Sequence, residues 1–135
     1  MRGLKPKLVV SNEVVKVVPA PPKWLPAAGK EEWRKCAPDL MARGLLTDTD
    51  TTALAHYCAA VARVQECAKI LSRGAMIKAP DKTTKTHPAV RVQHQYLETA
   101  RRYAAELGLT PVSRQRAQSP LKPKGDDDAF AEMDL

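Results

Sequence analysis

The chain has 135 residues and a formal net charge of +7, and aromatic side chains make up only 4% of it. This length holds one small domain plus tails, and so few aromatic side chains disfavour a large self-sufficient core, so we expect an all-α domain that completes its core by oligomerising. The N-terminus lacks an apolar signal core and no apolar run reaches about 18 residues, which disfavours secretion and a membrane span and favours the cytoplasm.

The charges are distributed unevenly along the chain. The last eleven residues contain five acids and no base, so the remaining 124 residues carry 22 bases against 10 acids. A basic body with an acidic tail predicts a polyanionic partner for the body and a separate contact for the tail. The acids of the tail are Asp126, Asp127, Asp128, Glu132 and Asp134.

The sequence shows none of the common catalytic patterns. It has no glycine-rich phosphate loop, no HExxH motif and no paired carboxylates in an apolar setting. Cys36, Cys58 and Cys67 have no zinc spacing, so we interpret them as buried thiols in a reducing compartment. The three histidines are interpreted as polar or capping side chains: His56, His87 and His94. We therefore expect a protein that is not an enzyme and that needs no metal or other cofactor.

Residues 1–22 are predicted to form a flexible basic tail. Four prolines forbid a regular helix there, and the bases outnumber the one acid, Glu13. The bases of this tail are Arg2, Lys5, Lys7 and Lys16.

The first predicted helix begins near Pro26, since proline is tolerated at the first helical position. Pro38 removes a backbone donor, so we expect a break or kink there and a short second piece that ends at Gly44. Trp24 and Trp33 are interpreted as core residues rather than as platforms on which bases stack. The expected packing face consists of Trp33, Cys36, Ala37 and Leu40.

The second predicted helix spans Thr49–Arg73 and ends before Gly74. Thr47 with Asp50 resembles a capping box at its start. A stripe stepping by three or four residues is expected to be buried: Leu54, Tyr57, Val61, Val64, Ala68 and Leu71. The opposite, solvated stripe consists of Arg63, Glu66, Lys69 and Arg73.

The segment between Gly74 and His87 allows two interpretations. Residues 76–78 can pair with residues 84–86 as a short β-hairpin, or the segment is a mobile loop. It is basic in either case, because it contains Lys78, Lys82 and Lys85.

The third predicted helix starts at Pro88 and packs antiparallel to the second as a helical hairpin. Glu98 and Arg102 are spaced for an ion pair. Gly108 is expected to end the helix in the left-handed conformation, and Thr110 to cap a short fourth helical turn. The inner face is expected to contain Val90, Leu97, Ala100, Ala104 and Leu107, with Tyr96 and Tyr103 beside it.

The order of these features resembles the phage terminase small subunit family of the cohesive-end type. The motif Pro22-Lys23-Trp24-Leu25 precedes a helix bearing Trp33, and residues 44–50 (GLLTDTD) lead to Tyr57-Cys58. The most distinctive part is LGLTPVSRQR over residues 107–116. The resemblance covers residues 22–116, and both tails fall outside it.

The resemblance implies a non-catalytic, ring-forming oligomer in the host cytoplasm. Such a protein recognises viral double-stranded DNA when packaging begins and delivers it to the large terminase subunit, which holds the ATPase and nuclease. On this basis residues 23–117 are expected to form the helical DNA-packaging and oligomerisation domain, and residues 118–135 a linker and acidic tail. No membrane contact is expected.

Two groups of side chains are candidates for these contacts. The candidate DNA-binding residues are Arg101, Arg102, Arg114, Arg116, Lys122, Lys124, Arg2, Lys5, Lys7 and Lys16. The candidate contacts to the large subunit are Asp126, Asp127, Asp128, Phe130 and Met133. For Arg114 an interface or capping role is an equal alternative. Two other functions also remain open, a helix-turn-helix transcriptional regulator built around residues 38–49 and a structural adaptor that binds no nucleic acid.

Overall fold

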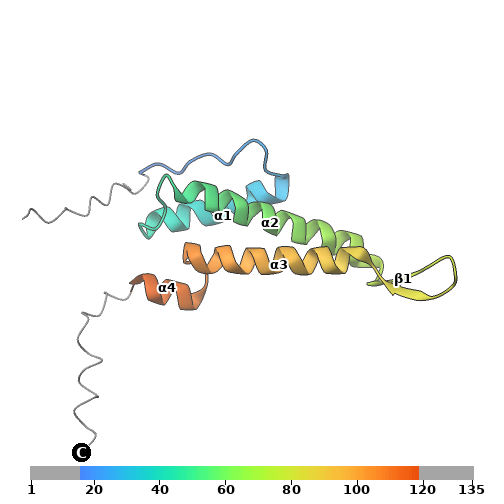
Figure 1. The fold of residues 1–135 in the computed structure, drawn as a ribbon. Coiled ribbons are helices and arrows are strands. Elements are labelled where there is room, and N and C mark those ends of the chain that lie inside the picture. The colour runs from blue at the N-terminus through green and yellow to red at the C-terminus, as the bar shows by residue number, and fades with distance from the viewer. Residues whose placement is uncertain (1–15, 119–135) are drawn as a thin grey trace, which may run out of the picture.

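Two long antiparallel helices and a shorter one beside them make up most of the fold (Figure 1). The computed structural model describes residues 16–118. The elements in chain order are α1 (Ala27–Ala42), α2 (Asp50–Ile70), the 3-10 turn η1 (Leu71–Arg73), β1 (Met76–Lys78), β2 (Thr84–Thr86), α3 (Pro88–Leu107) and α4 (Pro111–Gln118). This confirms the prediction of a helical domain with an antiparallel helical hairpin. Within the described residues, no helix combines the length and apolar character needed to span a bilayer.

Helix α1 runs without interruption through Pro38, so the predicted break at this residue is wrong. Ala37 and Leu40, on either side of it, are fully buried, whereas Pro38 is exposed. Packing of the buried face therefore holds the helix together across the missing backbone donor. The helix ends as predicted at Gly44, whose φ of 67° lets the Leu45 N–H reach the Leu40 carbonyl at 2.9 Å. The short helical pieces on which a helix-turn-helix interpretation rested are thus absent from residues 27–42.

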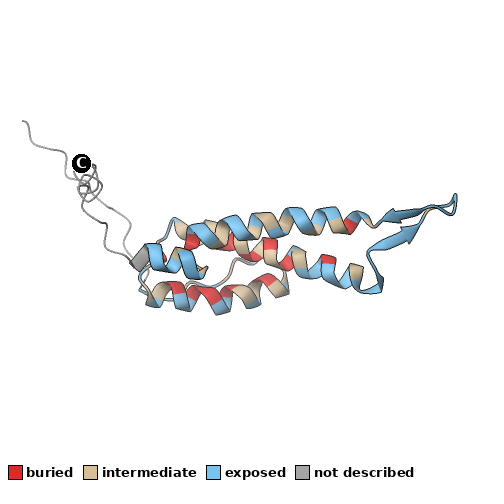
Figure 2. Ribbon diagram, turned by 90° about the horizontal axis from the view of Figure 1, so that it is seen from below, coloured by how far each residue is buried: buried red, intermediate tan, exposed pale blue. Residues whose placement is uncertain are grey.

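The core lies at the end of the molecule where α1 covers α2 (Figure 2). Trp33 is buried as predicted, and its indole N–H donates a 2.8 Å hydrogen bond to the Pro19 carbonyl. Trp24 is 61% exposed, which corrects its assignment to the core. The next residue, Leu25, is instead 3% exposed and belongs to the core cluster. The predicted domain boundaries, after residues 22 and 117, stay predictions.

Small side chains, rather than the predicted stripe, form the buried face of α2. Of that stripe only Leu54 is fully buried, and Ala68 is exposed. The two helices lie too close for a larger side chain: a Cβ at Gly29 of α1 would lie 3.1 Å from the Cys58 carbonyl oxygen of α2. The buried residues of α2 are Leu54, Ala55, Cys58, Ala60, Ala62 and Cys67. All three cysteines are buried free thiols, as predicted.

Helix α3 packs on α2 alone over most of its length, and this leaves apolar side chains uncovered. Leu97, which was predicted to lie on the inner face, is 49% exposed, because α1 covers only α2 and nothing described lies over the outer side of α3. Val92 of α3 and Ile70 of α2 are 39% and 49% exposed. The solvated stripe predicted for α2 is exposed throughout, as expected.

The link between α2 and α3 is a regular β-hairpin, which settles the two interpretations of this segment. Met76 pairs with Thr86, Ile77 with Lys85, and Lys78 with Thr84. The His87 N–H donates to the Ala75 carbonyl at 2.7 Å and closes the base of the hairpin. His87 then caps α3, because its Nδ1 accepts from the Ala89 N–H at 2.9 Å. The capping role predicted for a histidine is confirmed at this position.

Candidate nucleic-acid interface

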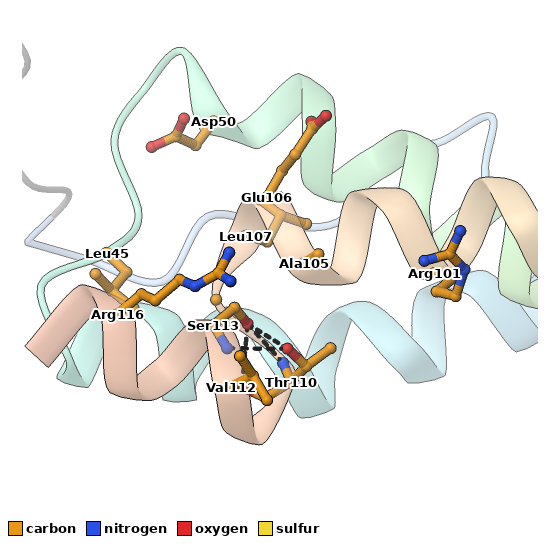
Figure 3. A pocket seen from close by; sticks show the side chains of 11 residues that line it. Leu45, Asp50, Arg101, Ala105, Glu106, Leu107, Thr110, Val112, Ser113 and Arg116 are labelled. Atoms are coloured by element: carbon orange, nitrogen blue, oxygen red, sulfur yellow. Dashed lines mark hydrogen bonds between the residues drawn. The ribbon is translucent and has the colours of Figure 1, made fainter.

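The corner between α3 and α4 positions four of the predicted DNA-binding arginines. Gly108 adopts a φ of 76°, and the Leu109 N–H reaches the Ala104 carbonyl at 2.8 Å, so α3 ends as predicted. Thr110 then caps α4: its hydroxyl oxygen accepts from the Ser113 N–H at 3.1 Å, and Ser113 Oγ accepts in return from the Thr110 N–H at 3.0 Å (Figure 3). This reciprocal cap fixes the direction in which α4 leaves the bundle.

Two of the arginines line one groove at this corner. It has a volume of about 550 Å³, and Arg101 and Arg116 lie at its two ends (Figure 3). Asp50 and Glu106 line the same groove, so its charge is mixed. Arg101 is also held by Glu98, whose carboxylate oxygen lies 2.9 Å from the guanidinium. The hydrogen bond and charge of Arg101 hold the pKa of Glu98 below its usual value.

The pairing of Glu98 with Arg101 replaces the predicted pairing with Arg102. Both arginines are exposed. In the structure Glu98 pairs with Arg101, three positions along the helix, and not with Arg102, four positions along. Arg102 instead lines a separate pocket with Thr99, Tyr103 and Glu106. The corner therefore places Arg101 and Arg102 in different hollows of the surface.

The other predicted contacts are dispersed. Arg114 is exposed on α4, where its backbone N–H continues the helix by bonding to the Thr110 carbonyl at 2.8 Å. Lys16 is exposed at the start of the described residues. The remaining candidates lie outside the described residues: Arg2, Lys5, Lys7, Lys122 and Lys124 for DNA, and Asp126, Asp127, Asp128, Phe130 and Met133 for the large subunit.

The strongest concentration of positive charge lies elsewhere, at the opposite end of the helical hairpin. Residues 69–91 contain six bases and one acid, Asp81, whereas the other described residues contain 11 bases and 8 acids. The six bases are all exposed: Lys69, Arg73, Lys78, Lys82, Lys85 and Arg91. The sequence shows that this segment is basic, but it leaves open whether the segment is a β-hairpin or a mobile loop, and therefore how its lysines are arranged.

A cluster of interacting titratable groups lies beside the core and has a structural character. Glu32 Oε1 accepts from the Tyr57 hydroxyl at 3.0 Å and from the Cys36 thiol at 3.3 Å. Burial, followed by the charge of Glu32, raises the pKa of the Cys36 and Cys58 thiols to about 12 and also raises the pKa of Tyr57. Protonated thiols are poor nucleophiles and poor metal ligands. Among the described residues no group of three or more His, Cys, Asp or Glu side chains is placed to hold a metal ion.

The described residues form a helical hairpin with a surplus of bases, 17 against 9 acids, and such a charge balance favours polyanionic partners. The sequence model of one family, described as phage terminase, small subunit, matches residues 29–124. This is most of the chain, which therefore belongs to the phage terminase small subunit family. No curated protein and no solved structure was found to match it. The resemblance stated from the sequence is thus confirmed at the level of the family.

Proposed function

We propose that this protein recognises viral double-stranded DNA at the start of packaging, delivers it to the large terminase subunit and regulates that subunit's ATPase and nuclease. The observation that carries the proposal is the family match over residues 29–124. The proposed role is non-catalytic and is performed in the host cytoplasm. The described surface exposes charged side chains and apolar faces, and both are suited to binding DNA or another protein chain.

DNA binding is proposed to depend mainly on phosphate contacts. The residues 16–118 carry 17 bases against 9 acids, and four of the bases are the arginines of the α3–α4 corner: Arg101, Arg102, Arg114 and Arg116. Each base that neutralises a phosphate releases a counterion, so affinity falls steeply as salt rises. The ten predicted DNA-binding residues remain proposals, and Arg101 is the weakest of the four corner residues because Glu98 already pairs with it.

Assembly into a ring is proposed to bury the apolar surface that one chain leaves open. Ile70, Val92 and Tyr96 line a groove between α2 and α3, next to the buried residues Cys67 and Ala89. The α2–α3 hairpin exposes this groove to solvent. Covering the groove with a second copy stabilises both copies by hydrophobic burial. Repetition around a closed ring also turns weak DNA contacts into strong total binding.

The experiment that tests this function measures binding of the full-length protein to a fluorescently labelled DNA duplex by anisotropy. We expect binding at about 50 mM salt and a loss of at least tenfold in affinity by about 200 mM, because several phosphates are contacted at once. A protein that leaves the anisotropy of the duplex unchanged at about 50 mM salt would contradict the proposal and favour a structural adaptor. Tight binding of a dimer to a single palindromic site would favour a transcriptional regulator instead.

A further inference from the structure

The β-hairpin formed by β1 and β2 projects beyond the ends of α2 and α3, at the end of the molecule opposite α4 (Figure 1). Figure 2 shows that it is exposed, and every residue from Ser72 to Lys78 and from Pro80 to Thr86 is classed as exposed. None of the residues of β1, β2 and their connecting turn belongs to the core cluster or to the partly buried hydrophobic residues packed against it. The hairpin therefore contributes little to the stability of the bundle.

The charge of this end is uncompensated. The segment 69–91, called the basic end below, has a net charge of +5, while the rest of the described chain has a net charge of +3. The four ion pairs found among the described residues all lie outside the basic end. Asp81, its one acid, accepts hydrogen bonds from the Thr83 hydroxyl at 2.6 Å and the Thr83 N–H at 3.1 Å. Its carboxylate thus orders the turn instead of pairing with a lysine.

The hairpin is also ordered before any partner arrives. The Lys82 N–H donates to the Ala79 carbonyl at 2.9 Å, and the Ala79 N–H donates to the Thr83 carbonyl at 2.8 Å. Lys82 takes a φ of 66° at the tip, the left-handed conformation that a tight turn requires. A ribbon that is already paired in this way loses less conformational entropy on binding than a mobile basic loop does.

The register distributes the lysines around the ribbon. Residues that face each other across an antiparallel pair point to the same side of the sheet, and successive residues alternate. Lys78, opposite Thr84, therefore lies on one face, and Lys85, opposite Ile77, lies on the other, with Lys82 at the tip. A ribbon with cations on both faces and at its end is suited to a space with phosphates on both sides.

We infer that the basic end is the principal DNA contact of this protein and that its hairpin enters the major groove of the duplex. The inference rests on the DNA-binding function proposed above and says where that function resides. The major groove is about 12 Å wide and admits a two-stranded β-ribbon, whereas the major groove of A-form RNA is deep and narrow. Lys78 and Lys85 would face the two flanking phosphate backbones, and the bases at the helix ends, Lys69, Arg73 and Arg91, would contact phosphates beside the groove.

The test compares two triple variants of the full-length protein that remove equal charge from opposite ends. The hairpin variant is Lys78→Gln, Lys82→Gln and Lys85→Gln, and the corner variant is Arg102→Gln, Arg114→Gln and Arg116→Gln. Binding to one labelled duplex is measured by anisotropy at several salt concentrations, after circular dichroism and light scattering show wild-type helicity and mass. A third variant replaces the same three lysines with arginine. A further wild-type titration adds methyl green, which occupies the major groove, or netropsin, which occupies the minor groove.

The hairpin variant is expected to lose at least tenfold in affinity, and the slope of log K against log salt should become shallower by about 0.9 for each lysine that contacts a phosphate. The corner variant should lose less than the hairpin variant, and the arginine variant should bind like the wild type. Methyl green, and not netropsin, should displace the protein. A hairpin variant within twofold of the wild type would overturn the inference while leaving the proposed function intact. A wild-type protein that binds no duplex would overturn both.

Discussion

Arg43 at the end of α1 donates a 2.9 Å hydrogen bond from Nη1 to the carbonyl of Gly108, 65 residues away at the end of α3. Its Nη2 also contacts Asp39 at 2.7 Å. One side chain therefore ties the C-terminal ends of two helices together and occupies the orphan carbonyl that the left-handed Gly108 leaves exposed. This contact fixes the corner from which α4 departs.

Replacing Arg43 with alanine is expected to lower the free energy of unfolding by about 1.5–3 kcal/mol, the usual range for a hydrogen bond to a charged group. Urea denaturation followed by circular dichroism measures the change. Arg34→Ala, which removes an exposed arginine from the same helix, serves as the control and should change stability by less than about 0.5 kcal/mol. Equal losses from the two variants would show that the Arg43–Gly108 contact adds nothing to stability.

Two glycines with the same backbone conformation allow strain and packing to be separated. Gly44 and Gly108 have φ values of 67° and 76°, so an alanine at either position should cost about 1–2 kcal/mol for the left-handed conformation. A Cβ at Gly44 meets nothing within 4 Å, but one at Gly108 lies 3.2 Å from Leu45 Cδ1. Gly108→Ala should therefore lower the thermal unfolding midpoint further than Gly44→Ala does. If Gly44→Ala were the more damaging change, the close packing at the corner would be disproved.

The pH dependence of stability follows from the buried thiols. The pKa values of Cys36 and Cys58 are raised from an ordinary value of 9.0 to about 12, so the folded state holds these protons more tightly than the unfolded state does. Their contribution to stability is complete below pH 9.0 and decreases as the pH rises toward about 12. Urea midpoints measured from pH 8 upward should fall accordingly. Glu32→Gln removes the charge that adds to both shifts and should make the fall less steep.

The proposed assembly depends on the groove lined by Ile70, Val92 and Tyr96. Val92→Asp places a charge in this groove, at a position already 39% exposed, so the monomer should still fold while the oligomer weakens. Size-exclusion chromatography with light scattering is expected to report a multimer for the wild type and a smaller species for Val92→Asp. Gln95→Asp adds the same charge at an exposed position of α3 that does not line the groove and should leave the mass unchanged. A wild-type protein that is a monomer at micromolar concentration contradicts ring assembly.

The sequence was sufficient to predict the elements whose ends carry strong local signals. Gly44, Gly74 and Gly108 terminate helices, Pro88 begins one, and the Thr110 cap forms as expected. These features depend on the conformational preferences of single residues, which act locally. For residues 74–87 the sequence allows a β-hairpin or a mobile loop, and the structure shows the hairpin, with residues 76–78 paired to residues 84–86.

The predictions that were wrong concern features that depend on packing between distant segments. The helix continues through Pro38 because its neighbours are buried against α2, and Leu97 is exposed because no element covers the outer side of α3. A hydrophobic stripe in a sequence cannot show which of two neighbouring faces receives the partner helix. The same limit applied to the candidate DNA contact. The sequence shows three lysines in one segment, but only the register of the hairpin places Lys78 and Lys85 on opposite faces and Lys82 at the tip.

The acidic tail connects this fold to the proposed function. Under the proposal, residues 126–135 dock the large terminase subunit, and the measurement that tests the central claim most directly is ATP hydrolysis by the cognate large subunit with this protein and DNA present. The full-length protein is expected to stimulate hydrolysis, and a chain lacking residues 126–135 is expected to bind DNA as before without stimulating. Stimulation by the deleted chain would contradict the role of the tail, and no stimulation by the full-length protein would contradict the account as a whole.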